Sequence, residues 1–205
     1  MIVVVNYGMG NLGSIVNMLK RLGVKAHVSS KPADIAEATK LILPGVGAFD
    51  TGMKQIMDRG LAEPLGRKVL GEKTPLLGIC LGMHLITRRS EEGRLEGLNW
   101  LDAEVVRFDT TSAPGVKVPH MGWNRVAPSP RSRLFHPLPP EPRFYFVHSF
   151  HVVSGQPDDI AASAFHGYRF VAAVERDNIA GVQFHPEKSH KFGMQLLQNF
   201  VERFG

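Results

Sequence analysis

Apolar positions in the first half of the chain form short unbroken runs that alternate with stretches of helical spacing. Leu12, Ile15, Val16 and Leu19 recur at helical intervals, and Gly23 ends that pattern. Strands are predicted at IVVVNY (2–7), KAHVSS (25–30), TKLILPG (39–45) and PLLGI (75–79), and helices at 11–23, 50–70 with an interruption near Pro64, and 80–89. Strands and helices in this order predict a mostly parallel sheet with helices on both faces.

The pattern changes in the second half, where apolar runs are separated by turns rich in proline and glycine. Strands are predicted at 101–108, 143–153, 170–177 and 179–186, with a hairpin loop between the last two. A final helix over 191–204 places Phe192, Leu196, Leu197, Phe200 and Phe204 on one stripe. The predicted fold is therefore α/β, with an open, mostly parallel sheet flanked by helices and a more antiparallel C-terminal half.

Composition narrows the class of protein. A length of 205 residues suits one domain, and 43% hydrophobic with 21% charged residues is ordinary for a globular protein. The net charge of +5 comes from scattered residues, so we expect no nucleic-acid partner. One cysteine cannot form an internal disulfide, and we see neither a signal peptide nor a membrane span. We expect a single cytoplasmic domain, 1–205.

The one cysteine, Cys80, lies on a predicted strand-to-helix turn. Gly78, Cys80 and Gly82 form the pattern G-x-C-x-G, a thiol version of the nucleophile elbow found in hydrolases. Glycines permit a sharp turn there, and ligands of open α/β sheets bind at the carboxyl ends of strands. A nucleophile is one interpretation, and a buried, inert cysteine is the alternative.

A base for that thiol is available near the C-terminus. In GVQFHPE, a predicted strand delivers His185 to its end, and Glu187 follows two residues later. The carboxylate could orient the imidazole while the other ring nitrogen faces the thiol. We therefore expect Cys80, His185 and Glu187 to form a catalytic triad.

Together these motifs resemble the class I (triad) glutamine amidotransferases, over nearly the whole chain. The resemblance implies that a thiolate attacks the glutamine side-chain amide, forms a glutamyl thioester and releases ammonia. A third element supports it, since Pro44-Gly45-Val46-Gly47 follows a predicted strand and matches the oxyanion loop of the family. The resemblance implies backbone contacts to the oxyanion from Gly45, Val46, Gly47 and Leu81.

Longer segments resemble one branch of that family, the glutaminase subunits of imidazole glycerol phosphate synthase in histidine biosynthesis. These segments are NYGMGNLGSI, LPGVGAF, KVPHMGWN, YFVHSFHV and HPEKS. The branch implies a separate (β/α)8 cyclase subunit that receives the ammonia, hence a heterodimer. It implies no cofactor and no metal.

The resemblance also assigns a glutamine pocket and a docking face. The pocket residues are His84, Glu92, His148, Ser149 and Phe150, with Glu92 meeting the α-ammonium group. This chain departs from the family twice, with His84 where glutamine is usual and Phe150 where tyrosine is usual; His84 could titrate. The docking residues are Asn11, Met121, Trp123 and Lys188, although ordinary core packing is an alternative role for Trp123.

The alternative functions are a dinucleotide-binding domain, another kind of cysteine hydrolase and a metal site. Gly8, Gly10 and Gly13 match a dinucleotide fingerprint, but the acidic residue expected at the end of the second strand is absent. A cysteine hydrolase acting on another amide or ester remains open. A metal site is disfavoured, because His148 and His151 would point to opposite faces of one predicted strand and there is a single cysteine.

Overall fold

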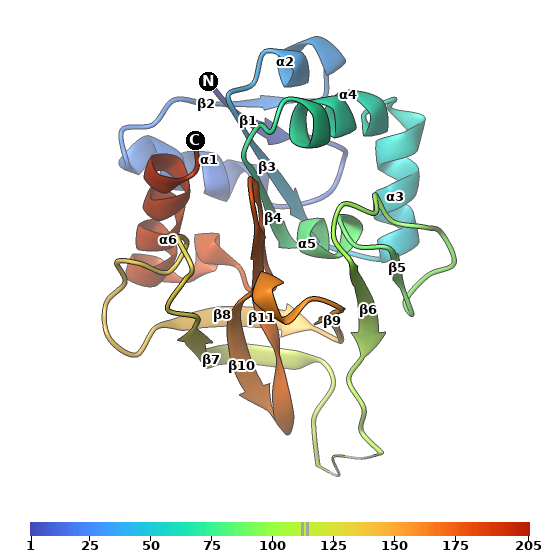
Figure 1. The fold of residues 1–205 in the computed structure, drawn as a ribbon, viewed down its shortest axis with the longest axis vertical. Coiled ribbons are helices and arrows are strands. Elements are labelled where there is room, and N and C mark those ends of the chain that lie inside the picture. Colours follow the sequence, from blue (N-terminus) through green and yellow to red (C-terminus); the bar gives the residue numbers. More distant parts are fainter. Residues whose placement is uncertain (112, 114) are drawn as a thin grey trace.

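The first half of the chain builds a parallel sheet whose strands are joined by helices (Figure 1). The computed structural model describes residues 1–111, 113 and 115–205. Its first strands are β1 (Ile2–Val5), β2 (Ala26–Ser29), β3 (Lys40–Gly45) and β4 (Leu76–Cys80). The helices are α1 (Leu12–Arg21), α2 (Pro32–Ala36), α3 (Phe49–Asp58), α4 (Ala62–Gly66) with a π-helical turn (Arg67–Gly71), and α5 (Leu81–Leu85).

The second half continues the sheet with mostly antiparallel pairing. Its strands are β5 (Arg89–Ser90), β6 (Ala103–Arg107), β7 (His120–Pro128), β8 (Arg143–His148), β9 (Phe150–Ser154), β10 (Ile160–His166), β11 (Tyr168–Arg176) and β12 (Ile179–Val182). Short 3₁₀ turns lie at Pro157–Asp159 and Pro186–Lys188, and α6 spans His190–Arg203. The strand order is β2-β1-β3-β4-β12-β11-β10-β7-β8, and β12 pairs parallel with β4 and antiparallel with β11. The predicted change from parallel to antiparallel pairing is confirmed.

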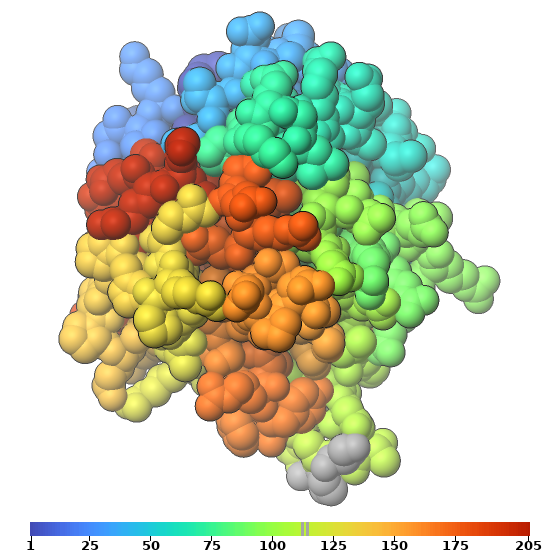
Figure 2. Space-filling model, in the orientation of Figure 1, coloured from blue at the N-terminus to red at the C-terminus, as the bar shows by residue number. Residues whose placement is uncertain are grey.

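Helices cover both faces of the parallel part, which explains why β1 is apolar at every position. Ile15 of α1 and Phe200 of α6 belong to one buried cluster. Met53 of α3 and Leu65 of α4 belong to the other. In the space-filling view the blue and teal segments of the first half lie in the upper part, and the yellow and orange segments of the second half lie in the lower part (Figure 2).

Several predicted elements need correction. The helix break lies at Gly60, which has a φ of +64°, and Pro64 sits inside α4. Helix α5 is only five residues long, because the chain enters β5 at Arg89. The single strand predicted over 143–153 is two strands, β8 and β9, which separate at Ser149 and pair with different neighbours. Strands β7 and β10 and helix α2 were missed.

The argument that placed His148 and His151 on opposite faces of one strand is therefore wrong. Both rings pack against Phe108, with centroid distances of 5.2 and 4.7 Å. Within the described residues, no group of three or more His, Cys, Asp or Glu side chains is arranged to hold a metal. The same described part of the chain holds no helix both long and apolar enough to cross a membrane.

Close backbone contact holds α5 against the neighbouring strand. A Cβ at Gly82 would lie 1.7 Å from the carbonyl oxygen of Leu43, and one at Gly78 would lie 2.8 Å from the carbonyl oxygen of Gly82. By contrast, a Cβ at Gly13 would meet nothing within 4 Å. The third glycine of the dinucleotide pattern therefore lacks the close helix–strand packing which that fingerprint requires.

We predict opposite effects of alanine at two helical glycines. Gly82→Ala forces a methyl group into the backbone of β3, so it should lower the free energy of unfolding by roughly 3 kcal/mol or more. Gly13→Ala lies in open space in α1 and should raise it by about 0.5–1 kcal/mol through helix propensity. Urea unfolding of both variants measures this, and equal stability of the two would contradict the packing described for Gly82.

Candidate active site

The ends of three adjacent parallel strands meet at one edge of the sheet. Gly45 at the end of β3 pairs in register with Cys80 at the end of β4. Strand β12 lies on the other side of β4, with Val182 paired to Ile79, and leads to His185. Three segments far apart in sequence therefore place a glycine loop, a thiol and an imidazole side by side.

The turn at Cys80 is strained. Cys80 has a φ of +53° and a ψ of −109°, a conformation that side chains other than glycine rarely adopt. The flanking glycines permit it, because Gly78 and Gly82 make the close backbone contacts described above. The turn places the thiol, at the last residue of β4, on the lining of a pocket.

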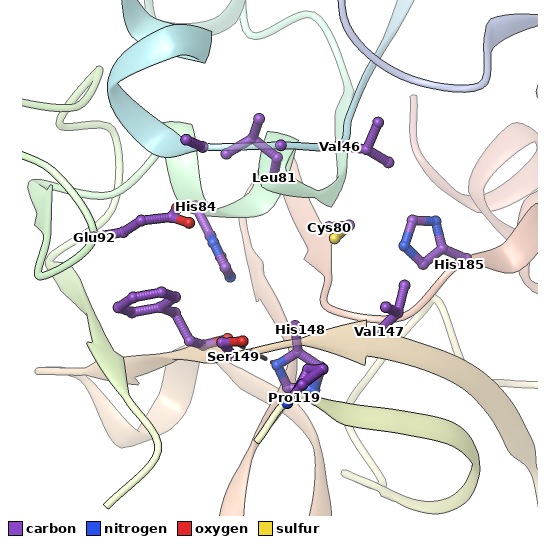
Figure 3. A pocket seen from close by; sticks show the side chains of 13 residues that line it. Val46, Cys80, Leu81, His84, Glu92, Pro119, Val147, His148, Ser149 and His185 are labelled. Carbon is purple, nitrogen blue, oxygen red and sulfur yellow. Dashed lines mark hydrogen bonds between the residues drawn. The ribbon is translucent and has the colours of Figure 1, made fainter. Parts of the chain in front are cut away.

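His185 and Glu187 form a buried pair, with side chains only 2% and 3% exposed. Nδ1 of His185 lies 2.8 Å from Oε1 of Glu187, so this nitrogen donates to the carboxylate. The other nitrogen, Nε2, is buried and makes no regular hydrogen bond to any described residue. Figure 3 shows Cys80 and the His185 ring beside each other.

The electrostatics of His185 favour its protonated form. Burial by itself lowers the pKa, but interaction with Cys80 and the hydrogen bond that His185 donates to Glu187 outweigh it, and the pKa is raised to about 9. Cys80 is thus near enough to the imidazole to favour its protonated form. At neutral pH this site holds an imidazolium ready to give up a proton.

A pocket of about 500 Å³ opens in front of Cys80. Its lining contains all five residues expected to bind glutamine: His84, Glu92, His148, Ser149 and Phe150. Val46, Gly47 and Leu81 of the expected oxyanion site also line it, whereas Gly45 lies behind them. Figure 3 shows Glu92 and His84 on one side of the Cys80 sulfur and His185 on the other.

Glu92 is held at the pocket by the start of α3. Its Oε2 accepts a hydrogen bond of 3.0 Å from the backbone N–H of Phe49. Burial raises the pKa of Glu92, the hydrogen bond from Phe49 lowers it, and the charge of Asp50 raises it further. Asp50 in turn accepts from the N–H groups of Arg94 and Leu95, which fixes the loop that carries Glu92.

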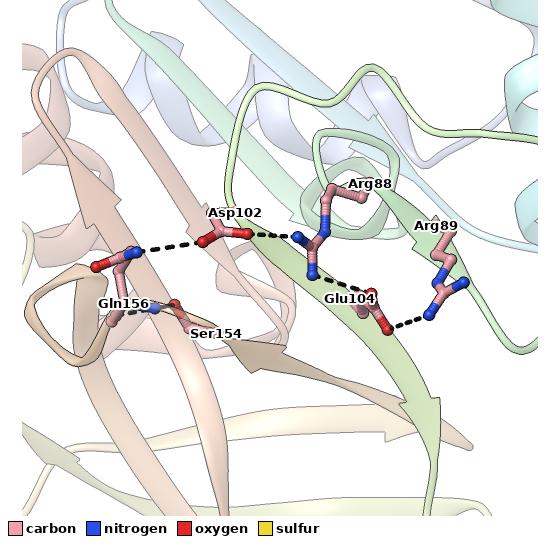
Figure 4. Close-up of polar contacts among 6 residues, drawn as sticks. All are labelled: Arg88, Arg89, Asp102, Glu104, Ser154 and Gln156. Carbon is pink, nitrogen blue, oxygen red and sulfur yellow. Dashed lines mark hydrogen bonds and ion pairs between the residues drawn. The ribbon is translucent and has the colours of Figure 1, made fainter.

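The other end of this loop is held by an ion-pair network (Figure 4). Arg88 pairs with Asp102 at 2.7 Å and with Glu104 at 2.9 Å, and Arg89 pairs with Glu104 at 3.1 Å. Gln156 donates to Asp102 and connects the network to the segment after β9. These charges are largely solvent-exposed, so each pair contributes little alone, but together they hold the exit of α5 against β6.

His148 belongs to a chain of neutral histidines. Its Nδ1 donates to the carbonyl of Phe150 at 2.7 Å, so its Nε2 accepts from Nδ1 of His120 at 2.8 Å. Nε2 of His120 accepts in turn from Asn124 at 3.1 Å. Burial lowers the pKa of His148 well below its ordinary value and that of His120 to about 4. His148 of β8 and His120 of β7 therefore carry no positive charge at neutral pH.

His84 is also neutral. Burial lowers its pKa to about 4, although a hydrogen bond to Gln183 partly opposes this. Nε2 of His84 lies 2.8 Å from the amide oxygen of Gln183 and therefore donates to it. The expectation that His84 could titrate does not hold near neutral pH, because the side chain is buried.

The residues expected at a docking face lie outside the pocket and are exposed. Met121 and Trp123 are 62% and 46% exposed, so the core-packing alternative for Trp123 is wrong. The Trp123 ring stacks on His190, and Lys188 Nζ lies 5.4 Å from the Tyr145 ring centre. Asn11 caps α1, which packs against the turn that contains Lys188.

Sequence reasoning missed part of the site. Ala48, Pro119 and Val147 also line the pocket, and Gln183 binds His84 from behind. Pro119 and Val147 lie within segments that had suggested the branch of the family, but no local pattern marked them as lining residues. Tyr7, beside Gly45, likewise had no sequence signal beyond its place in NYGMG.

Comparison with solved structures agrees on the fold. A glutamine amidotransferase from Thermotoga maritima superposes with a TM-score of 0.70 at 16% identity, over 99% of this chain and 96% of that one. Another structure described as a glutamine amidotransferase gives a TM-score of 0.70 at 21% identity, over 98% and 97% of the two chains. At this level of identity the likeness concerns the fold alone.

Sequence comparison is more specific. Residues 3–204 match the family model "Glutamine amidotransferase class-I". Imidazole glycerol phosphate synthase subunit HisH 2 of Pseudomonas aeruginosa is 52% identical, over 98% of this chain and 99% of that protein. The protein of the same name from Methanococcus maripaludis is 51% identical over 99% and 100%. The chain therefore belongs to the class-I glutamine amidotransferases and, within them, to the family of imidazole glycerol phosphate synthase subunits HisH.

Proposed function

We propose that residues 1–205 act as one glutamine amidotransferase domain, the glutaminase subunit of an imidazole glycerol phosphate synthase in histidine biosynthesis. The observation that supports this most is the meeting of a strained thiol, a protonated histidine–glutamate pair and a glycine loop on one pocket. We place this enzyme in the cytoplasm.

The first half-reaction forms a thioester. The Cys80 sulfur attacks the side-chain amide carbon of glutamine, and the carbonyl electron pair moves onto oxygen. Backbone N–H groups of the Gly45–Gly47 segment and of Leu81 stabilise that oxyanion. His185 protonates the amide nitrogen, the C–N bond breaks, and ammonia leaves with its nitrogen lone pair.

The second half-reaction releases glutamate. Neutral His185 takes a proton from water as the water oxygen attacks the thioester carbon, and the C–S bond then breaks. The imidazolium and the thiolate are restored, and one glutamine and one water have become glutamate and ammonia. Glu187 keeps the imidazole in the orientation that serves both steps, through the Nδ1 hydrogen bond.

The rest of the pocket orients the substrate. Glu92 accepts from the α-ammonium group, and the neutral walls of His84 and His148 avoid repelling it. Ser149 and Phe150 complete the side of the pocket opposite α5. Phe150 lacks a hydroxyl, so it contributes packing and its backbone rather than a side-chain hydrogen bond.

A (β/α)8 cyclase subunit is the partner in this proposal. All four expected docking residues, Asn11, Met121, Trp123 and Lys188, are exposed. Met121 and Trp123 lie on β7, which pairs with β8, and Val147 of β8 lines the pocket. Exposed aromatic and Met side chains are enriched at interfaces. Ammonia passes to the cyclase, which combines it with a ribulosyl aminoimidazole nucleotide to give imidazole glycerol phosphate and an aminoimidazole carboxamide ribotide.

The proposed function is tested by measuring glutamate release from glutamine by this chain alone and mixed with a cyclase subunit and its nucleotide. Strong activation in the mixture supports the proposal. Comparable activity without the partner would retain the amidotransferase chemistry but contradict the synthase assignment. Turnover of simple esters with no glutaminase activity in any mixture would favour a different cysteine hydrolase.

We predict that Cys80→Ala lowers glutamine-dependent turnover by at least about 1,000-fold, because no other side chain replaces the nucleophile. Synthesis by the complex from added ammonium salt should continue at the wild-type rate, which controls for folding and docking. Both rates are measured as imidazole glycerol phosphate formed. Glutaminase activity retained in this variant would exclude Cys80 as the nucleophile.

A further prediction concerns pH. The raised pKa of His185 stabilises the folded chain fully below the ordinary value of 6.5, and this contribution is lost as pH rises through about 9. Glutamate release, which needs the imidazolium, should fall over the same alkaline range. Glu187→Gln removes one of the groups that raise this pKa, so the alkaline limb should move to lower pH.

The measurement is the pH profile of kcat in the complex, together with urea unfolding at pH 6 and pH 9. Glu92→Gln serves as the control, since Glu92 does not contact His185; it should leave the alkaline limb of kcat in place. An unchanged alkaline limb in Glu187→Gln would show that the carboxylate does not set the protonation of His185.

A further inference from the structure

Tyr7, just after β1, carries a hydroxyl that the mechanism above does not use. The residue is fully buried, and its Oη makes no hydrogen bond to any described residue. Burying an unpaired hydroxyl lowers stability, so such groups are rare in native proteins and require a reason. Phenylalanine would fill the same space without that cost.

The hydroxyl lies against the glycine loop. A Cβ placed on Gly45 would come within 2.1 Å of Tyr7 Oη, so only a glycine allows this approach. Gly45 is the residue that pairs in register with Cys80. The phenol therefore lies against the loop residue that pairs with the nucleophile.

The residues after Tyr7 follow the same loop. A Cβ on Gly10 would contact Gly45 N and Pro44 at 3.4 Å, and a Cβ on Gly47 would lie 2.6 Å from the Met9 side chain. The segment 7–10 therefore packs along the segment 44–47. Gly47, with a φ of +110°, gives this loop the freedom to turn its peptides at low steric cost.

The orientation of one peptide bond in the loop decides both where its N–H points and where its carbonyl points. Its N–H and C=O point in opposite directions, so a peptide that turns its N–H toward the pocket turns its carbonyl toward the protein interior. Tyr7 Oη lies beside Gly45, within 2.1 Å of the position that a Cβ would take, and Gly45 contributes the carbonyl of the peptide that precedes Val46. Burial and the nearby charge of Cys80 both raise the pKa of Tyr7, so the hydroxyl keeps its proton and can donate.

We propose that Tyr7 is a positioning residue for the oxyanion loop: in the reacting conformation its O–H donates to the Gly45 carbonyl and thereby holds the Val46 N–H toward the substrate oxyanion. This inference rests on the proposed function. It explains why a costly unpaired phenol is kept beside Gly45, since the hydroxyl gains its partner when the loop reaches that conformation. Tyr7 does not touch the substrate and acts through the loop.

The test is Tyr7→Phe in the complete complex with the cyclase subunit and its nucleotide. We expect kcat for glutamate release to fall roughly tenfold or more, the effect of one hydrogen bond made in the transition state, with KM for glutamine nearly unchanged. The aldehyde analogue of glutamine, glutamate γ-semialdehyde, forms a tetrahedral adduct with a thiol. Its inhibition constant should rise by the same factor, because the adduct needs the oxyanion site.

Stability separates positioning from a merely structural role. Tyr7→Phe removes an unpaired group, so the Tm of the chain should stay the same or rise. Tyr168→Phe is the matched control, because the Tyr168 hydroxyl accepts from the Asp109 N–H at 3.0 Å and contacts His151 Nε2 at 3.1 Å. That variant should lose stability and keep its kcat.

Unchanged kcat in Tyr7→Phe overturns the inference, as does a lower kcat accompanied by a lower Tm and unaltered aldehyde binding. A lower kcat and weaker aldehyde binding at equal or higher Tm support it. Failure of the proposed function appears separately, as the absence of partner-dependent glutaminase activity in the wild-type complex.

Discussion

The contact between α5 and the end of β3 is the constraint on which the site depends. Because Gly82 lies against the Leu43 carbonyl, the chain leaving β4 has no room for an ordinary strand-to-helix turn. Cys80 takes the strain as a positive φ and so reaches the pocket. Strands β3, β4 and β12 are adjacent and parallel, so their carboxyl ends lie at the same edge of the sheet. The glycine loop at the end of β3 and His185 after β12 are therefore neighbours of Cys80 there.

Much of this arrangement could be predicted from the sequence, because it depends on patterns within short segments of the chain. The alternation of strands and helices, the elbow glycines around Cys80 and the stripe on α6 depend on periodicity and on residue type at single positions. The contact between His185 and Glu187 could be predicted because both residues follow the end of the same strand.

The rest depends on contacts that no local pattern records. The chain divides at Ser149 into β8 and β9 because different neighbours, β7 and β6, are available on its two sides. Helix α5 is short because the chain enters β5 at Arg89, where Arg88 and Arg89 pair with Asp102 and Glu104 (Figure 4). The neutrality of His84 and His148 is set by burial, which follows from the whole fold.

The pocket therefore has a distinct charge arrangement. One imidazolium, at His185, faces the thiol, while His84 and His148 stay uncharged on the other walls. Had those histidines been exposed, each could gain a proton in mildly acidic conditions and place a further positive charge in the pocket. Burial confines the positive charge to the histidine that has a carboxylate partner.

The two ends of the pocket differ in character, with Glu92 at one end, Val147 at the other and Cys80 between them (Figure 3). In the proposed function, an amino acid held by its charged head at Glu92 would point its amide toward the thiol, and the departing nitrogen would face the apolar end. Val147 of β8 pairs with the exposed Met121 of β7, two residues from Trp123, so this end lies next to exposed residues expected at the docking face. Under the proposed function, the polar end receives glutamine, and the small neutral product forms on the far side of Cys80 from Glu92.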